Sequence, residues 1–256
     1  MNVPVEEGSG YALVCKGLTK RFGGLDAVNK VDLRIAAGER RALIGPNGAG
    51  KTTLFSLISG LHAVTSGSVF LFGKEVTALP SHKRAALGLA RTFQITNLFP
   101  TMTVIDSVVL ASLCLKRVKF SMLKPLSRYR YLYQEAEKIL ERVGMAEKSK
   151  EIVRNLSHGE QRQIEIALAL VSNPKVLLLD EPTAGLSPAE SGMMARMIHG
   201  LDPAITVLII EHDMDVALQV ADLITVLHRG EVFEEGCNRD ICSSSRVQEI
   251  YFGAEE

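Results

Sequence analysis

A glycine-rich segment in the first quarter of the chain constrains the fold more than any other sequence feature. It reads Gly45-Pro46-Asn47-Gly48-Ala49-Gly50-Lys51-Thr52-Thr53. Glycines let successive backbone N–H groups turn toward one anion, where a Cβ atom would obstruct the phosphates. A short apolar run before the segment and a helical pattern after it predict a strand–loop–helix unit, whose helix N-terminus favours negative charge. The segment therefore predicts a nucleotide-binding loop, with Lys51 reaching the β- and γ-phosphates and the Thr52 hydroxyl binding Mg²⁺.

A second apolar run, residues 176–179, ends in two carboxylates, Asp180 and Glu181. Parallel sheets bind ligands at the carboxyl ends of their strands. Because adjacent side chains of a strand point to opposite sides, the two carboxylates have different predicted roles. Asp180 would hold Mg²⁺, directly or through water, and Glu181 would polarise the attacking water. Asp-Glu can also be a simple exit of a strand into solvent, but its pairing with the phosphate loop favours Mg²⁺-dependent hydrolysis.

The remaining pattern predicts an α/β fold. Alternation of apolar and polar residues over 28–35 indicates a half-buried antiparallel strand. Fully apolar strands alternating with helices indicate a mostly parallel sheet covered on both faces. Residues 104–115 and 131–143 have helical spacing. We therefore expect one domain over residues 1–256. It would have a P-loop NTPase core over 1–94 and 172–256 with an N-terminal antiparallel β subdomain, and an α-helical subdomain inserted over 95–171.

The composition of the chain limits which partners it can bind and in which cellular compartment it is expected. The chain is 46% hydrophobic and 23% charged, which is ordinary for a globular protein. Its 29 basic and 29 acidic residues create no global field for polyanions, which argues against nucleic acid as the main partner. No apolar run approaches the roughly 18 residues of a membrane span, and the first residues lack a signal-peptide pattern. We expect a cytoplasmic protein with four buried, free cysteines.

A third motif, Leu156-Ser157-His158-Gly159-Glu160-Gln161, precedes a helical pattern. Ser157 and Glu160 fit a capping box, which alone would explain their spacing. The motif does not stand alone, however. It follows the phosphate loop and Gln94, and it precedes the acidic strand and His212, which comes after the apolar run 207–210.

This order of motifs resembles the nucleotide-binding domain of the ATP-binding-cassette (ABC) family over residues 11 to about 236. The resemblance implies that the Ser157 motif of one subunit caps a nucleotide held by the phosphate loop of a second, so that two domains close head to tail. A helix N-terminus with a serine hydroxyl suits that task because it supplies donors to the terminal phosphate. The resemblance also implies that Phe22 stacks on adenine, that Gln94 approaches Mg²⁺ and water, and that His212 contacts the γ-phosphate.

The predicted site thus has three parts. The predicted catalytic residues are Lys51, Gln94, Glu181 and His212. The predicted nucleotide-binding residues are Phe22, Gly45, Pro46, Asn47, Gly48, Ala49, Gly50, Lys51, Thr52, Thr53, Ser157, Gly159 and Glu160. The predicted Mg²⁺ ligands are Thr52, Gln94 and Asp180. Two departures stand out: His158 and Glu160 replace the family's commonest Gly and Gln, and Ser187 stands where Asp or Asn is usual. Ser187 also begins a capping box with Glu190.

The resemblance extends to one group of the family. Arg21-Phe22-Gly23-Gly24-Leu25, Arg91-Thr92-Phe93-Gln94 and Glu211-His212-Asp213-Met214 are similar to the branched-chain amino-acid (LIV-type) importers. This implies an ATP-hydrolysing subunit bound peripherally to the cytoplasmic face of the inner membrane. Its implied partners are integral membrane permease subunits, a second ATPase subunit that is a paralogue or an identical copy, and, indirectly, a periplasmic solute-binding protein. The solute would be a branched-chain amino acid, or a urea, amide or aromatic acid.

Two other classes of function remain alternatives. One is a soluble cassette ATPase that acts on nucleic acid or ribosomes; such relatives usually carry two cassettes or a long coiled coil, and the sequence predicts neither. The other is a nucleotide-sensing regulator without turnover. The presence of Lys51, Asp180, Glu181 and His212 argues against this second class.

Overall fold

The computed structural model describes residues 10–92, 98–115 and 130–252 of the chain. The chain divides into two compact units. The first comprises Met1–Arg91, Lys175–Glu181 and Asp202–Glu256, and the second comprises Thr92–Pro174 and Pro182–Leu201. The second unit spans the whole of the predicted helical insertion, 95–171, and in addition residues 92–94, 172–174 and 182–201; the predicted subdomain boundaries stay a prediction.

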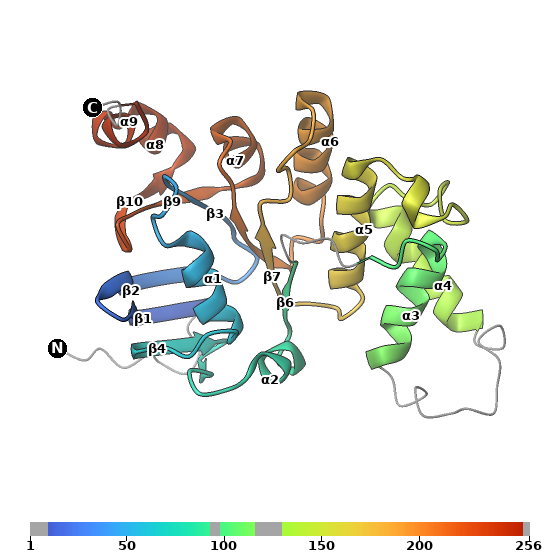
Figure 1. The fold of residues 1–256 in the computed structure, drawn as a ribbon, viewed down its shortest axis with the longest axis horizontal. Coiled ribbons are helices and arrows are strands. Elements are labelled where there is room, and N and C mark those ends of the chain that lie inside the picture. The colour runs from blue at the N-terminus through green and yellow to red at the C-terminus, as the bar shows by residue number, and fades with distance from the viewer. Residues whose placement is uncertain (1–9, 93–97, 116–129, 253–256) are drawn as a thin grey trace. The chain divides into compact units, whose positions relative to one another are not determined.

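The first unit contains two sheets (Figure 1). The antiparallel sheet has the order β2-β1-β4-β5, from β1 (Tyr11–Phe22), β2 (Leu25–Ala36), β4 (Ser66–Leu71) and β5 (Lys74–Glu75). The second has the order β10-β9-β3-β8-β7-β6, from β3 (Arg40–Ile44), β6 (Leu89–Arg91), β7 (Val176–Asp180), β8 (Thr206–Ile210), β9 (Leu223–His228) and β10 (Glu231–Cys237). Only β10 is antiparallel in it. The predicted α/β fold with an antiparallel β subdomain and a mostly parallel sheet is confirmed.

The alternation of buried and exposed residues along β2 explains how this strand pairs with β1 in the antiparallel sheet. Val31, Leu33 and Ile35 of β2 are at most 1% exposed, whereas the residues between them face solvent. The register pairs Cys15 with Leu33 and Leu18 with Val31, so apolar side chains of β1 and β2 share one face. A strand with one buried face has its register fixed, because a slip by one residue would turn every apolar side chain to water.

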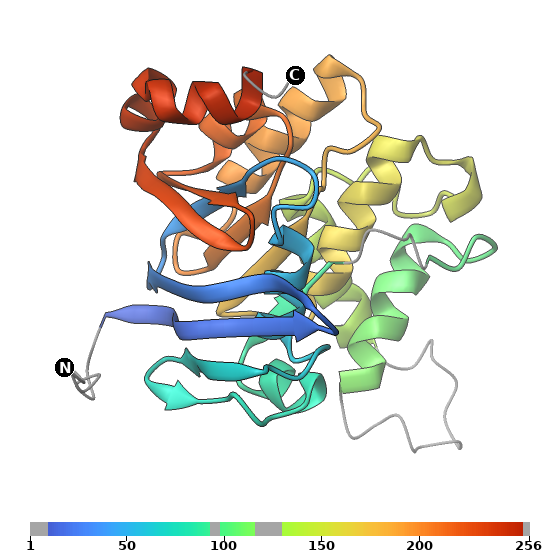
Figure 2. The same cartoon turned by 60° about the vertical axis from the view of Figure 1, so that its left-hand side comes forward.

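Helix α1 (Lys51–Ser59) lies between the two sheets, in contact with β1 and β2 on one side and with β6 on the other (Figures 1 and 2). Its apolar side chains, Leu54, Phe55, Leu57 and Ile58, are all fully buried. Burial of a large apolar side chain contributes about 1.5–3 kcal/mol. Because strands of both sheets pack against α1, this helix, which begins directly after the glycine-rich loop, is held firmly in place.

A buried arginine caps the other end of α1. Arg84 is 1% exposed and belongs to the short helix α2 (Ser81–Ala86). Its Nη1 donates to the carbonyl oxygens of Leu57 and Ile58, both at 2.7 Å. Its Nε and Nη2 donate to the carbonyls of Leu79 and Thr77, each at 2.9 Å. A cation is favourable at the C-terminus of a helix because it faces the negative end of the helix dipole.

The remaining helices of the first unit follow the strands of the parallel sheet. They are α7 (Met214–Val220), α8 (Asn238–Ser243) and α9 (Ser245–Phe252). Two short strands, β5 and β6, and helix α2 were not expected from the sequence. Strand β6 has three residues, too few for a period to show.

The second unit, as far as it is described, is helical. It consists of α3 (Val104–Leu115), α4 (Arg130–Arg142), a 3₁₀ turn (Val153–Asn155), α5 (His158–Leu170) and α6 (Pro188–His199). Helix α3 contacts α4 and α5, and α5 contacts α6. The helices expected over residues 104–115 and 131–143 are confirmed. In the described part of the chain, no helix is both long enough and apolar enough to span a membrane.

The cysteines differ from the prediction. Cys15 is buried in the core of the first unit, where burial raises the pKa of its thiol to about 12. Cys114, Cys237 and Cys242 are exposed free thiols, so the expectation of four buried cysteines is wrong for three of them. Cys237 stands just before α8, where its thiol donates to Asp240 at 3.0 Å. This position at a helix N-terminus keeps the side chain at the surface.

We predict that Arg84→Met lowers the free energy of unfolding by about 3 kcal/mol or more, because buried carbonyls would lose their donors at about 1–3 kcal/mol each. For a chain of this size the loss corresponds to a fall in Tm of roughly 6–12 °C. Thermal and urea unfolding followed by circular dichroism would measure it. Exposed Arg34, on β2, provides the matched control, and Arg34→Met should leave Tm within about 2 °C. Equal stability of the two variants would contradict the capping role.

Candidate functional site

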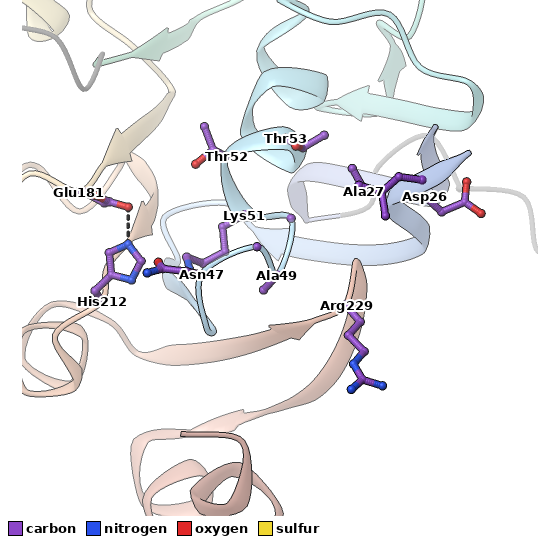
Figure 3. A pocket seen from close by; sticks show the side chains of 13 residues that line it. Asp26, Ala27, Asn47, Ala49, Lys51, Thr52, Thr53, Glu181, His212 and Arg229 are labelled. Atoms are coloured by element: carbon purple, nitrogen blue, oxygen red, sulfur yellow. Dashed lines mark hydrogen bonds and ion pairs between the residues drawn. The ribbon is translucent and has the colours of Figure 1, made fainter. Parts of the chain in front are cut away.

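A cavity of about 580 Å³ lies in the first unit, and Figure 3 shows the side chains that line it. Its volume falls within the range of ordinary small-molecule sites. The lining residues come from the glycine-rich loop, the start of α1, the end of β7, the end of β8, the start of β2 and the turn after β9. They are Leu25, Asp26, Ala27, Asn47, Gly48, Ala49, Gly50, Lys51, Thr52, Thr53, Glu181, His212 and Arg229.

Parallel pairing brings these segments to one edge of the sheet. Leu43 of β3 lies opposite Ile210 of β8, and Asp180 of β7 lies opposite the same Ile210. The glycine-rich loop after β3, Glu181 after β7 and His212 after β8 therefore emerge side by side. The sequence predicted this meeting of motifs, and the structure confirms that the first unit brings Lys51, Glu181 and His212 to one cavity.

The loop requires glycine for its packing as well as for access of a ligand. Gly45 and Gly50 have φ angles of 147° and 100°, which L side chains rarely adopt. A Cβ atom at Gly45 would lie 2.1 Å from the carbonyl oxygen of Leu227, and one at Gly50 would lie 2.3 Å from that of Ala27. Gly48 also has a positive φ, of 80°, but a Cβ there would meet nothing within 4 Å.

Lys51 is 5% exposed and points back along its own loop. Its ammonium group donates to the carbonyl oxygens of Gly45 at 2.6 Å and Pro46 at 3.1 Å. Burial lowers the pKa of Lys51, while the nearby carboxylates of Glu181 and Asp180 act in the opposite direction. Because hydrogen bonds between ionised groups are stronger than those to neutral carbonyls, an anion in the cavity would be a better partner for this ammonium.

Glu181 and His212 form a pair at one end of the cavity. Oε1 of Glu181 lies 2.5 Å from Nε2 of His212, as the dashed line in Figure 3 marks. The backbone of Glu181 has a φ of 50°, and its N–H donates to the carbonyl oxygen of Ile210 at 3.0 Å. A left-handed conformation at a non-glycine residue costs of order 1–3 kcal/mol and is often found at functional sites. The turn away from the strand carries the Glu181 side chain into the cavity.

Asp180 has a separate environment. It is 2% exposed, does not line the cavity, and accepts a hydrogen bond from Nη2 of Arg91 at 2.7 Å. Burial raises the pKa of the Asp180 carboxyl, and the Arg91 guanidinium counteracts that rise. The two adjacent carboxylates therefore have different partners, as their alternation along the strand predicted.

Not every predicted contact residue lines this cavity: Gly45 and Pro46 are absent from its lining, as is Asp180. Phe22, at the end of β1, is 46% exposed and absent from the cavity lining. Its ring lies edge-on to His62 at 5.8 Å between centroids, with the ammonium of Lys20 4.9 Å from the ring centre. Contact of Phe22 with adenine stays a prediction. Gln94 lies outside the described residues, so its predicted contacts with Mg²⁺ and water also stay predictions.

Other lining residues were not expected from the sequence. Asp26 and Ala27 lie across the cavity from Glu181 and His212, with Arg229 in the turn after β9 (Figure 3). That turn is held against the loop because the N–H of Gly230 donates to the carbonyl oxygen of Ala49 at 2.9 Å. Arg229 and Gly230 lie in the turn between β9 and β10, and the place of this turn beside the loop depends on the long-range pairing of β9 with β3.

The Ser157 motif belongs to the second unit, where it begins α5. Ser157 Oγ accepts from the N–H of Glu160 at 3.3 Å, and Glu160 Oε2 accepts from the N–H of Ser157 at 2.9 Å, so the predicted capping box is present. Glu160 also pairs with Lys148, which is the main cause of its lowered pKa. Ser157, Gly159 and Glu160 line a different cavity, of about 360 Å³. Ser187 and Glu190 form the same kind of box at the start of α6.

A glycine-rich loop between a buried strand and a helix, with acidic residues at the end of a neighbouring parallel strand, defines a P-loop nucleotide-binding domain. The family model described as ABC transporter matches residues 28–184. The chain therefore belongs to the ABC transporter family.

Individual relatives agree with this assignment. The chain is 39% identical to the high-affinity branched-chain amino acid transport ATP-binding protein LivG of Salmonella typhimurium, and the match covers 94% of this chain and 97% of the relative. It is similar in structure to MJ1267, an ATP-binding cassette of an ABC transporter in its ADP conformation, with a TM-score of 0.84, 29% identity, and coverage of 95% and 99% of the two chains. It also resembles the dimeric, post-hydrolysis cassette MJ0796 bound to ADP and Pi, with a TM-score of 0.74, 26% identity, and coverage of 89% and 99%.

We predict that Gly50→Ala destabilises the loop by about 2 kcal/mol or more, because the new Cβ would meet a backbone oxygen and the φ angle is unfavourable. The matched control is Gly48→Ala, which has the unfavourable φ without the clash and should cost about 1 kcal/mol. Urea unfolding of both variants would measure the difference. A Gly50→Ala chain as stable as Gly48→Ala would show that the close approach of Ala27 is not required.

Proposed function

We propose that this chain binds and hydrolyses ATP with Mg²⁺ and thereby powers the uptake of branched-chain amino acids, or of a related small solute such as another amino acid, an amide, urea or an aromatic acid. One observation carries the proposal. Lys51, Glu181 and His212 line one cavity in a chain that is 39% identical to a branched-chain amino acid transport ATP-binding protein over nearly its whole length. The solute class is proposed from the transport function of that relative.

The loop residues supply the binding energy for the phosphates. Residues 47–53, which include the start of α1, line the cavity and offer backbone N–H donors to the phosphates. The first turn of α1 has no acidic residue, so no side chain of that turn opposes an anion at the helix N-terminus. Lys51 would exchange its carbonyl partners for the β- and γ-phosphates. Base recognition by Phe22 is part of the proposal.

The side chains proposed to bind Mg²⁺ carry oxygen ligands, which a hard cation prefers. Thr52 offers a hydroxyl at the start of α1, and Asp180 offers a carboxylate at the end of β7. Among the described residues, no group of three or more His, Cys, Asp and Glu side chains could hold a metal unaided. Mg²⁺ in general takes few protein ligands and completes its coordination with water and nucleotide phosphates. When bound, Mg²⁺ would neutralise charge that develops on the phosphates; Gln94 is the third proposed contact.

Glu181 and His212 would act on the reacting end of the nucleotide. Glu181 lies in the cavity on a strained backbone and would orient the attacking water and accept its proton. His212 holds the Glu181 carboxylate and, in the proposed mechanism, shifts its hydrogen bond to the γ-phosphate. A positioned general base contributes roughly 10²–10⁴-fold to a rate.

The proposal places the chain in an assembly at the cytoplasmic face of the inner membrane. Two ATPase subunits, identical or paralogous, would close head to tail so that the Ser157 motif of each covers the nucleotide of the other. The dimeric state of the similar cassette MJ0796 supports this arrangement. Integral permease subunits would hold the dimer at the membrane and carry the solute, which a periplasmic protein delivers, so the solute itself never touches this chain.

We predict that Glu181→Gln keeps ATP affinity within about threefold but lowers steady-state phosphate release at least about 10²-fold, because the amide cannot accept the proton. Phosphate release by the subunit with its permease, ATP binding by calorimetry, and uptake of labelled leucine by cells expressing the whole transporter would be measured together. Glu137→Gln is the matched control, since Glu137 is an exposed acid on α4.

The control variant should retain both phosphate release and uptake. Normal phosphate release by the Glu181→Gln chain would refute the catalytic assignment. Leucine uptake unaffected by this variant, with loss of urea, amide or aromatic-acid uptake instead, would move the proposal to that other solute class.

A further inference from the structure

Arg91 is a buried arginine that connects the acidic strand to the loop helix. It is the last residue of β6, next to β7 in the sheet, and its backbone lies opposite Leu178. Its guanidinium is 9% exposed and the Asp180 carboxylate is 1% exposed. Nη2 of Arg91 lies 2.7 Å from Oδ2 of Asp180. In the sequence, Arg91 belongs to the motif before Gln94, and the motif predicts no role for its side chain.

The other half of the guanidinium is fixed to α1. Nη1 donates to Ser59 Oγ at 3.0 Å and to Ser56 Oγ at 3.3 Å. The guanidinium carbon lies 5.7 Å from the centre of the Phe55 ring, within cation–π range. Ser56 Oγ in turn donates to the carbonyl oxygen of Thr52 at 2.8 Å. A continuous chain of hydrogen bonds therefore connects the backbone carbonyl of Thr52, through Ser56 Oγ and the Arg91 guanidinium, to the Asp180 carboxylate.

Arginine suits this position because its guanidinium is a rigid, planar group with several donors in fixed directions. It can hold a carboxylate on one side and two hydroxyl groups on the other at the same time. A lysine ammonium, a single point on a flexible stem, could not fix the separation between β7 and α1 in the same way. Arg84 shows the contrast: it binds the same helix at its C-terminal carbonyls and fulfils a purely structural task.

We propose that Arg91 is a positioning residue for Mg²⁺ binding: it fixes the Asp180 carboxylate relative to α1, and so relative to the Thr52 hydroxyl. The inference rests on the proposed function, in which Thr52 and Asp180 are Mg²⁺ ligands. Residues that orient metal ligands through hydrogen bonds commonly change metal affinity by about 10–100-fold when they are replaced. Arg91 therefore acts on the metal and not on the binding of phosphates by the loop.

Binding of ADP to the purified subunit, in excess EDTA and in excess Mg²⁺, separates these two effects. ADP avoids closure of the dimer and turnover, so the readout is independent of activity. For Arg91→Met we expect ADP affinity in EDTA to stay within about twofold of the wild type, and the gain in affinity from Mg²⁺ to fall by about tenfold. Arg34→Met, a change of the same type at an exposed site on β2, should leave the gain unchanged.

Ser59→Ala is a second, milder variant that keeps the Arg91–Asp180 ion pair and removes one anchor to α1. It should lower the Mg²⁺ gain in the same direction by a smaller factor. If Arg91→Met does not fold, this variant decides the question. An unchanged Mg²⁺ gain in the folded variants, or equal losses of ADP affinity in EDTA and in Mg²⁺, would overturn the inference.

The wild-type control distinguishes failure of the inference from failure of the proposed function. A wild-type chain that binds ADP without any gain from Mg²⁺ would overturn the role of Arg91. A wild-type chain that binds ADP neither in EDTA nor in Mg²⁺ would instead refute the nucleotide-binding function on which the inference depends.

Discussion

The parallel pairing of β8 with both β3 and β7 is the constraint on which the site depends. It places Leu43 and Asp180 on either side of Ile210, so the segments that follow these three strands leave the sheet at one edge. Each segment carries a different kind of group: backbone donors and Lys51 after β3, carboxylates at the end of β7, and His212 after β8. All these strands are buried on both faces, and the burial of their apolar side chains fixes the register that aligns the polar groups.

The polar groups around the cavity are held by close packing of the backbone. Gly45 and Gly50 let the loop approach β9 and β2 so closely that a methyl group would overlap a carbonyl oxygen. Helix α1 is fixed at its far end by Arg84 and along its side by Arg91. Rigid placement of donors and charges before a ligand arrives is what allows them to stabilise a reacting phosphate without rearrangement. The hydrogen bond from the Glu181 N–H to the Ile210 carbonyl oxygen helps to hold the unfavourable backbone angle at Glu181.

Much of this could be predicted from the sequence because the signals are local. The loop 45–53, the apolar strand before Asp180 and the capping box at Ser157 each lie within a few residues, and the structure contains the expected element at each place. What could not be predicted depends on contacts between distant segments. Strand β6 is too short to show a period, and Arg229 reaches the cavity through pairing of β9 with β3. The exposure of three cysteines depends on helix faces and caps, which composition does not reveal.

Two of the three residues that depart from the family pattern have local structural explanations. Glu160 and Ser187 both take part in capping boxes in the second unit, so each residue type is compatible with the start of its helix. Lys148 pairs with Glu160, whose negative charge is itself favourable beside the α5 N-terminus.

The central claim is that the loop centred on Gly48 binds a nucleoside triphosphate through its backbone donors and Lys51. Isothermal titration calorimetry of the purified chain with Mg-ATP tests it most directly, with Lys51→Ala beside the wild type. The account predicts saturable binding of one nucleotide per wild-type chain and a loss of affinity of at least about tenfold in the variant, because a hydrogen bond between charged groups contributes about 1.5–3 kcal/mol. No heat of binding in the wild type, or equal affinity in a folded Lys51→Ala chain, would contradict the account.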